Sequence, residues 1–295
     1  MTGIIVRAIS SFYYVDVDSK VYECKARGIF KHKNQEFAVG DKVDLEVTDE
    51  ETLKGVIVNK HKRKNFLKRP PIANVTQAIL VFSIKSPDPN FSLIDRFLIT
   101  ARSQGIDTVI CFNKTDLDDM NTVEEMMINY KDSGSPVFAV CAKSGYNMDE
   151  FRLHLKDNIS VVAGPSGVGK STIINRIVEG INLQTGDVSE KIGRGRHTTR
   201  HTQLIEIDEN SFIADTPGFS SIDVNEIADN QLKEYFQEFY KFDEDCKFGS
   251  KCLHLSEPQC AVKDAVEDNE ISKHRYESYV QLLNEIREYK KRRNY

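Results

Sequence analysis

Residues 164–171, with the sequence GPSGVGKS, have the types and spacing of a phosphate-binding loop. The pattern G-x-x-x-x-G-K-[ST] lets backbone N–H groups surround a phosphate, lets the lysine reach its outer oxygens and gives Mg²⁺ a hydroxyl ligand. An apolar run precedes the loop and a helical pattern follows it, which disfavours a chance glycine-rich turn. The residues predicted to contact phosphate are Gly164, Pro165, Ser166, Gly167, Val168, Gly169, Lys170, Ser171 and Thr172. Ser171 is also predicted to bind Mg²⁺.

A second set of side chains would select the base. Asn113-Lys114-Thr115-Asp116 ends the apolar run IDTVICF, as an N-K-x-D loop requires. Asp116 would accept hydrogen bonds from N1–H and the exocyclic amine of guanine, which adenine cannot offer. Asn113 would brace the loop, and the stem of Lys114 would cover the base. A lone four-residue match also fits a helix cap, but its strand context and the phosphate loop favour GTP.

A looser base-side match follows at Cys141-Ala142-Lys143-Ser144, at the end of another predicted strand. A backbone amide there would meet the guanine O6, so Ala142 and Lys143 are predicted to line the site. Cys141 itself, with Cys24 and Cys111, lies within or beside an apolar stretch. The sequence favours an inert, buried thiol at each of these three positions.

Two further segments would respond to the γ-phosphate. Asp215-Thr216-Pro217-Gly218 ends the run SFIAD, so Asp215 would orient a Mg²⁺-bound water and the Gly218 amide would contact the γ-phosphate. Residues 193–202, GRGRHTTRHT, would close on the nucleotide, with Thr199 favoured over Thr198 as the ligand of Mg²⁺ and γ-phosphate.

Hydrolysis needs a group that positions water, and the usual glutamine is missing after Gly218. Phe219 occupies that position and cannot orient a water molecule. His197 is the best candidate for this catalytic role, and a solvent-facing side chain is the alternative. Arg194, Arg196 and Arg200 could add positive charge in the transition state or contact RNA.

The elements that position these loops alternate between buried strands and amphipathic helices from residue 75 onward, which indicates an α/β domain with a mainly parallel sheet. The base-selecting loops precede the phosphate loop, and the two γ-phosphate segments follow it. This order is that of a GTPase domain cut at one connection and rejoined at its old ends, a circular permutation. Such a cut is physically tolerable because domain termini often lie close together.

The N-terminal residues form a different module. About five short strands within residues 1–69 predict a small barrel of the oligonucleotide-binding type, and Pro70-Pro71 predicts a linker. This module has 14 Lys and Arg against 10 Asp and Glu, whereas the whole chain has a net charge of −5. A solvated charged end is the commoner explanation for the basic run at 60–64, but the barrel and its aromatic residues make RNA contact more plausible for this module.

A cysteine and histidine cluster follows the GTPase segments. Cys246, Cys252, His254 and Cys260 lie within 15 residues, in a mostly helical region. In a chain without a secretion signal, such a cluster favours metal binding over disulfides, and three thiolates with one imidazole suit a closed, structural Zn²⁺ site. The gap between Cys246 and Cys252 is wider than usual for such sites, so three reduced thiols remain the alternative.

These motifs together resemble the RsgA family of small-ribosomal-subunit biogenesis GTPases over essentially the full chain. The resemblance rests on NKTD before GPSGVGKST, on GRGRHTT, on DTPGF and on the Cys/His spacing. It implies an N-terminal five-stranded barrel (1–69), a central circularly permuted P-loop GTPase domain (70–222) and a C-terminal helical zinc-binding domain (223–295). It also implies binding to the small (30S) subunit through 16S rRNA, GTP hydrolysis stimulated there, one Zn²⁺, Mg²⁺ with GTP, and a role for His197.

Two other functions stay open from the sequence. One is a GTP-dependent RNA-binding chaperone in which hydrolysis only resets binding. The other is a tRNA- or metabolite-binding protein with a degenerate nucleotide site, which the intact Lys170, Ser171, Asp116 and Asp215 disfavour. No run of 18 apolar residues and no signal-peptide layout is evident, so a cytoplasmic monomer without membrane contact is expected.

Overall fold

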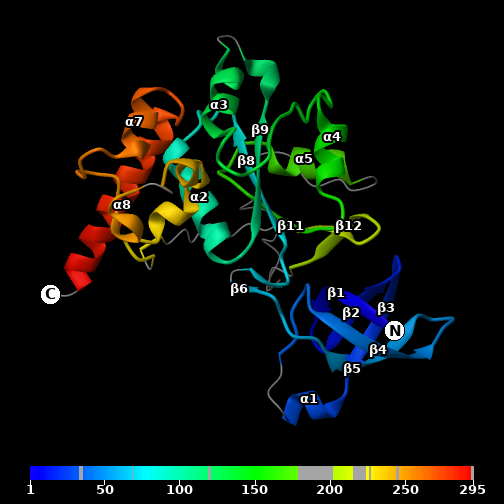
Figure 1. Ribbon diagram of the computed structural model, residues 1–295. Coiled ribbons are helices and arrows are strands. Elements are labelled where there is room, and N and C mark those ends of the chain that lie inside the picture. The colour runs from blue at the N-terminus through cyan, green and yellow to red at the C-terminus, as the bar shows by residue number, and fades with distance from the viewer. Residues whose placement is uncertain are drawn as a thin grey trace.

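Three regions follow one another along the chain (Figure 1), namely a barrel, a helix-covered sheet and a helical C-terminal region. The computed structural model describes residues 1–32, 36–68, 70–118, 121–178, 202–214, 224–225, 227–243 and 246–293. His197, Thr199, Asp215 and Gly218 lie outside these residues, so the predictions made for them are not tested by the structure.

The N-terminal barrel is closed, with the strand order β1-β2-β3-β5-β4. Its strands are β1 Thr2–Ile9, β2 Phe12–Val17, β3 Lys20–Ala26, β4 Lys42–Asp49 and β5 Lys54–Lys60, and the short helix α1 Gly28–His32 follows β3. Asp18 and Ser19 both have positive φ, 50° and 60°, which suits the tight turn that joins β2 to β3. Alternate residues such as Ile5, Val43 and Ile57 fill the interior, so the five-stranded barrel expected from the sequence is confirmed.

A small hairpin occupies the segment for which the sequence predicts a linker. Strands β6 Phe66–Lys68 and β7 Pro71–Ala73 pair with each other, and Ala73 N donates to the carbonyl oxygen of Val39 at 2.8 Å. Proline is tolerated at the first residue of such an edge strand because its nitrogen needs no partner there. Ile72 is fully buried. The segment is therefore packed onto the barrel, and the domain boundary proposed after residue 69 falls inside this hairpin.

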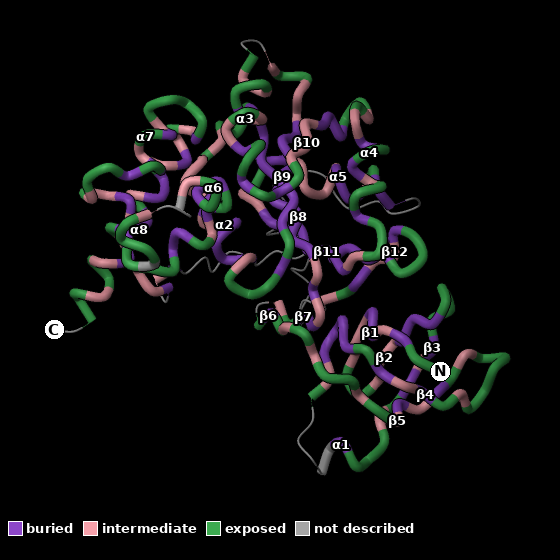
Figure 2. The backbone as a smooth tube through the Cα atoms, viewed as in Figure 1, coloured by how far each residue is buried: buried purple, intermediate pink, exposed green. Residues whose placement is uncertain are grey.

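The central sheet has six strands in the order β10-β9-β8-β11-β13-β12. Every neighbouring pair is parallel except β12 with β13. The strands are β8 Gln77–Ser83, β9 Asp107–Asn113, β10 Val137–Ala139, β11 Ile159–Ala163, β12 Leu204–Asp208 and β13 Ser211–Ala214. All residues of β8 and β11 are buried, and Figure 2 shows these central strands in purple. Burial on both faces explains the continuous apolar runs in the sequence.

Helices cover both faces of this sheet. Helices α2 Phe91–Ser103 and α3 Thr122–Tyr130 pack on the face that receives Leu80 and Phe82 of β8. Helices α4 Met148–His154 and α5 Lys170–Ile177 pack on the face that receives Ile79 and Val81. This is a doubly covered α/β architecture, as the alternating pattern predicts.

The C-terminal region packs against helices α2 and α3. Ile99 of α2 belongs to the same apolar cluster as Leu282 and Ile286 of the last helix. The helical elements of this region are η3 Leu232–Tyr235, η4 Gln237–Phe239, α6 Tyr240–Asp243, η5 Gly249–Lys251, α7 Ala261–Glu267 and α8 Lys273–Arg293. Among the described residues no helix is long and apolar enough to cross a membrane.

Arg275 of α8 is a buried charge at the junction with α2. Its guanidinium forms ion pairs with Asp95 of α2 and with Glu238 of η4, the latter at 2.6 Å, and it lies 4.5 Å above the ring of Phe236. Both carboxylates are buried. Burial raises the pKa of Asp95, while the charge of Arg275 opposes that shift. One arginine thus ties three elements together at the base of the C-terminal region.

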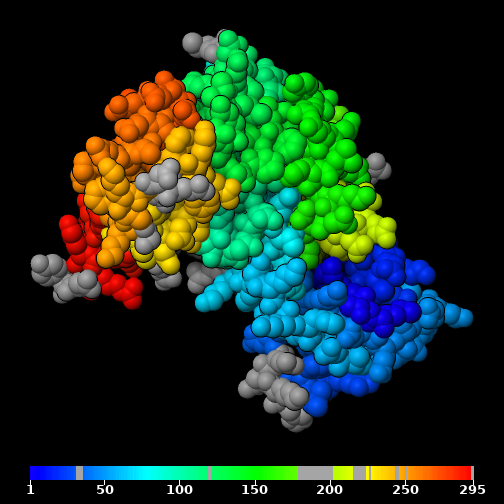
Figure 3. Space-filling model, viewed as in Figure 1, coloured from blue at the N-terminus to red at the C-terminus, as the bar shows by residue number. Residues whose placement is uncertain are grey.

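The barrel meets the sheet at the edge strand β12 (Figure 3), where the blue and yellow-green surfaces touch. Arg7 of β1 forms an isolated antiparallel bridge with Gln203, and Ser19 Oγ donates to Glu206 Oε1 at 2.7 Å. Burial and the nearby charge of Glu206 raise the pKa of Asp16 to about 6. The barrel therefore covers an edge that would otherwise expose unpaired backbone groups.

Candidate nucleotide and metal sites

Three strands deliver the predicted nucleotide loops to one edge of the sheet. The strands β9, β10 and β11 end at Asn113, Ala139 and Ala163, and β8 joins β9 to β11 in this parallel part of the sheet. Because parallel strands share their carboxyl edge, the loops that follow them meet in the crevice where α/β proteins bind ligands. The phosphate loop and the N-K-x-D loop, far apart in sequence, are brought together in this way.

Two glycines of the phosphate loop lie so close to other chain segments that a side chain would clash there. Gly164 has φ 143°, and a Cβ there would lie 2.0 Å from the carbonyl oxygen of Val81. Gly169, at φ 95°, is the N-cap of α5, and a Cβ there would lie 2.3 Å from Nδ2 of Asn113. Side chains are excluded at both positions, so the sequence pattern reflects packing as well as phosphate binding.

The lysine of the loop turns back over the loop itself. Lys170 Nζ donates to the carbonyl oxygens of Gly164 at 2.9 Å and Pro165 at 2.6 Å. Ser171 and Thr172 lie in the first turn of α5 and are partly exposed, while Ser166 and Gly167 are exposed at the tip of the loop. These residues present polar groups at the open edge of the sheet.

Asn113 joins the phosphate loop to both base-side loops. Its Nδ2 donates to the carbonyl oxygen of Val168 at 2.9 Å, and its Oδ1 accepts from the backbone N–H of Ala142 at 3.1 Å. The side chain is 3% exposed. A buried amide satisfied on both sides holds its partners in one geometry. The bracing role predicted for Asn113 from the sequence therefore has a direct counterpart in these two hydrogen bonds.

The other residues of the base-side loops lie near the two hydrogen bonds of Asn113. Lys114 adopts a left-handed conformation, φ 66°, and its Nζ donates to the carbonyl oxygen of Ser86. Asp116 is exposed and Thr115 is partly exposed, so both can reach a ligand. Lys143, on the loop that follows β10, is also exposed. Cys141 is buried as expected, but its thiol is not isolated, because Sγ donates to Oδ1 of Asp116 at 3.1 Å. Sequence reasoning missed this contact.

The Cys/His cluster forms a second site in the C-terminal region. Cys252, His254 and Cys260 are buried, and their ligand atoms lie within 4.8 Å of one another. Each of the two Sγ atoms lies 3.4 Å from Nδ1 of His254. A tetrahedral Zn²⁺ with Zn–S of about 2.3 Å and Zn–N of about 2.05 Å would separate these atoms by about 3.6 Å. The observed spacing fits a metal ion of this size.

The surroundings of the cluster are also those of a metal site. Cys246 is partly exposed, and its thiol is hydrogen-bonded to that of Cys252. Burial raises the pKa of Cys252 to about 12, so a cation is needed to hold this thiolate at neutral pH. Tyr276 and Tyr279 of α8 donate their hydroxyls to the carbonyl oxygens of His254 and Leu253 at 2.6 and 2.8 Å. The ligand loop is thereby anchored to α8.

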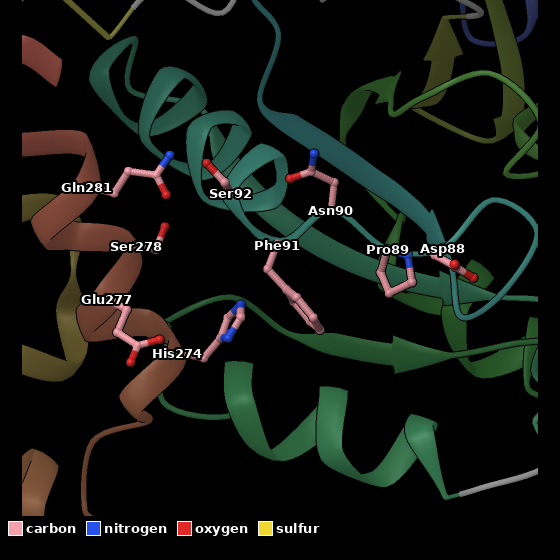
Figure 4. A pocket seen from close by; sticks show the side chains of 9 residues that line it. All are labelled: Asp88, Pro89, Asn90, Phe91, Ser92, His274, Glu277, Ser278 and Gln281. Carbon is pink, nitrogen blue, oxygen red and sulfur yellow. The ribbon is translucent and has the colours of Figure 1, made fainter.

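A pocket of about 510 Å³ lies between the start of α2 and α8 (Figure 4). Phe91 and His274 line it side by side, and their rings contact each other edge-on with centroids 4.2 Å apart. Its lining residues are Asp88, Pro89, Asn90, Phe91, Ser92, His274, Glu277, Ser278 and Gln281. None of these belongs to the predicted nucleotide loops, so the pocket is separate from the site at the sheet edge.

Two family models match the chain. The RsgA GTPase model matches residues 60–225, and the RsgA N-terminal domain model matches residues 2–57. A protein of Alkaliphilus metalliredigens, named small ribosomal subunit biogenesis GTPase RsgA, is 45% identical over 293 residues, which cover 99% of each chain. A protein of the same name from Clostridium novyi is 46% identical over 97% of each chain.

Solved structures resemble the chain over nearly its full length. YjeQ from Thermotoga maritima has a TM-score of 0.80 and 38% identity, with 97% of this chain and 98% of that one covered. YloQ, described as a circularly permuted GTPase, has a TM-score of 0.81 and 34% identity, with 97% and 95% covered. A circular permutation, which the motif order of this chain predicts, is thus described for a structural relative.

Proposed function

The chain belongs to the RsgA GTPase family, and from this premise we propose that it hydrolyses GTP during biogenesis of the small ribosomal subunit. The observation that carries the proposal is the double hydrogen bond of Asn113, which joins the phosphate loop to the base-side loops. A loop that only resembled a phosphate-binding sequence would have no reason to be tied to an N-K-x-D loop. The site therefore supports one ligand with phosphates at one end and guanine at the other.

Each side chain at the sheet edge has a role in this proposal. Lys170 leaves the carbonyl oxygens of its own loop and binds the β- and γ-phosphates. Asp116 accepts two hydrogen bonds from guanine. Ser171 and Thr199 would hold Mg²⁺, which neutralises phosphate charge when it is bound, and Asp215 would orient one of its waters. The amide of Gly218 would contact the γ-phosphate.

His197 is proposed to position the attacking water, because Phe219 cannot do so. His197→Ala should abolish ribosome-stimulated turnover and leave GTP binding within about twofold of wild type, since the imidazole would act only on the water. Stimulated turnover that survives in this variant would refute the assignment. Phosphate release measured beside nucleotide titration separates the two effects.

The barrel and the Cys/His cluster are proposed to serve the ribosomal contact. Lys25 is exposed on the barrel, and its Nζ lies 4.9 Å from the ring of Phe12. A cation beside an aromatic ring on a small barrel suits a single-stranded RNA, and we propose 16S rRNA as that RNA. One structural Zn²⁺, held by Cys246, Cys252, His254 and Cys260, would stabilise the C-terminal region. We expect the protein to act as a monomer in the cytoplasm.

GTP turnover with purified small subunits, with large subunits and without ribosomes tests the proposal. We expect stimulation by the small subunit alone, and Lys170→Ala should lose turnover under all three conditions. Equal turnover under all three conditions with nucleotide-dependent RNA binding would instead favour a GTP-dependent RNA chaperone. Failure to bind GDP at micromolar concentration would overturn the nucleotide site itself.

A further inference from the structure

Two pockets adjoin between the helices α2, α3 and α8, and neither is lined by the predicted nucleotide loops. The first is the pocket of about 510 Å³ shown in Figure 4. The second, of about 420 Å³, is lined by residues of α3, by residues 269–272 and by the start of α8. His274 and Glu277 line both pockets, so the two form one depression, which we call the α8 groove.

Carboxylates outnumber cations in the α8 groove. The lining carboxylates are Asp88, Glu125, Asp132, Glu238, Glu270 and Glu277, and the lining cations are Lys131 and Lys273. Four of these carboxylates have a cation beside them, including Glu277, which lies 3.8 Å from Lys273 in an exposed pair. Asp88 and Glu125 have no ion-pair partner in the described part of the chain. Exposed pairs are weak, so a cation from a partner can replace Lys273 as well as fill the unbalanced positions.

Apolar side chains lie among these charges, on walls that are already held in place. Ile128 of α3 is 54% exposed, and Phe91 is partly exposed in the first pocket. The hydroxyl of Tyr130 donates to the carbonyl oxygen of Phe91 at 3.4 Å, and Ser272 Oγ donates to Oδ1 of Asn129 at 2.7 Å. These bonds tie α3 to α2 and to the start of α8. A preformed groove loses little conformational freedom when a partner binds.

We propose that the α8 groove binds a basic protein segment of the small ribosomal subunit. Lysine and arginine have an apolar stem and a charged head, which suits a groove that offers both apolar side chains and carboxylates. RNA is disfavoured there because its phosphates would be repelled by the same carboxylates. The barrel module, with 14 Lys and Arg against 10 Asp and Glu, lies at the opposite end of the molecule from α3 (Figure 1). The inference rests on the proposed function and assigns the two ends to different components of the subunit.

The affinity of the full chain for purified small subunits, measured with a non-hydrolysable GTP analogue, tests the sign of this effect. Asp88→Asn combined with Glu277→Gln removes two charges, keeps the side-chain shapes and should weaken binding by about fivefold, the scale of two exposed ion pairs. The matched control is Asp149→Asn combined with Glu150→Gln. These two exposed carboxylates lie on α4, outside the groove, and their loss changes the net charge equally. The control should stay within about twofold of wild type.

The apolar part of the groove has its own pair of variants. Ile128→Ser should weaken binding to small subunits by about threefold, because Ile128 loses its contact with the stems of the partner. Leu153→Ser is the control, since Leu153 of α4 is 73% exposed and lines neither pocket. It should bind like wild type. All four substituted positions of the two groove variants and the control pairs are at the surface, and the melting temperature of each variant verifies that it is folded.

A benzophenone amino acid in place of Gln281, which is exposed and lines the first pocket, identifies the occupant. We expect a photocrosslink to a protein of the small subunit. A crosslink to rRNA or to a second copy of this chain would overturn the proposal. So would groove variants that bind as tightly as wild type or more tightly, the latter being the result expected for RNA. If the wild type did not bind small subunits, the proposed function would fail, whereas a binding wild type with unaffected groove variants would refute only the groove.

Discussion

Removal of the buried guanidinium of Arg275 at the α2–α8 junction should lower the free energy of unfolding more than removal of any exposed charged side chain. Arg275→Met keeps most of the apolar stem but leaves Asp95 and Glu238, at 0% and 8% exposure, without their cation. Breaking a buried ion pair by removing one partner costs about 3–5 kcal/mol. The cost arises because each remaining carboxylate has lost its water and now lacks its counter-charge.

The pH dependence of the loss distinguishes an uncompensated charge from a packing defect. Burial already raises the pKa of Asp95 in the folded protein, and loss of Arg275 removes the charge that opposes this shift. A carboxyl group whose folded pKa lies above its unfolded value of about 3.9 destabilises the fold at neutral pH and less in acid. The deficit of Arg275→Met should therefore be largest near pH 7 and shrink as the pH falls toward 4.

Urea unfolding of both proteins at several pH values, followed by hydrogen exchange in α2 and α8, gives the required free energies. Arg292→Met is the matched control, since Arg292 is on the same helix but its side chain is 82% exposed. We expect the control to change stability by less than about 0.5 kcal/mol. A deficit below about 1 kcal/mol for Arg275→Met, or one that does not change with pH, would refute the reasoning.

Three further outcomes follow from single features. Gly169→Ala should weaken GDP binding by more than about tenfold, because its Cβ would lie 2.3 Å from the side-chain amide of Asn113, which joins the loops. Gly105→Ala is the control in the same titration. Gly105 has φ 68° and nothing within 4 Å of an added Cβ, so this variant should keep the Kd for GDP within about twofold of wild type. Asp16→Asn should match wild type in Tm near pH 4 and exceed it by about 2–6 °C at pH 8. The folded pKa of Asp16, about 6, lies above its unfolded value, so the ionised carboxylate destabilises the wild type as the pH rises. An equal difference in Tm at both pH values would contradict this. Elemental analysis should find one zinc per chain; Cys260→Ser should lose the metal and Cys24→Ser in the barrel should keep it, and full zinc content in Cys260→Ser would contradict the site.

The sequence predicts the fold well wherever a local pattern has one structural solution. The run that forms β8 is apolar throughout and has to be buried on both faces, and the turn at Asp18-Ser19 has residues that tolerate positive φ. The hairpin at Pro71 was not predicted, because Pro-Pro is also typical of linkers. Its pairing depends on the burial of Ile72 beside Val39, a residue that is distant in sequence.

The polar contacts that the sequence did not predict, in the fold and in the site, depend on partners that are distant in sequence. Arg275 lies in a helix rich in exposed charges, and nothing local distinguishes it from Arg292; its partner Asp95 is 180 residues away. Cys141 was expected to be an inert thiol, and only the pairing of β9 with β10 brings it to Asp116. Periodicity identifies the elements, but it does not specify which polar side chains will meet across them.

The rotated motif order also sets the sequence of events during synthesis. In the sheet, β8 is the neighbour of β11, yet β11 begins 76 residues after β8 ends. At a translation rate of about 5–20 residues per second, the nascent chain carries β8 with one unpaired apolar edge for about 4–15 s. During this interval the base-recognition half is a sheet fragment without its phosphate-binding half, and the unpaired edge of β8 can pair with a wrong strand. Slower translation lengthens that interval, so the yield of folded protein should depend on elongation speed between residues 84 and 163.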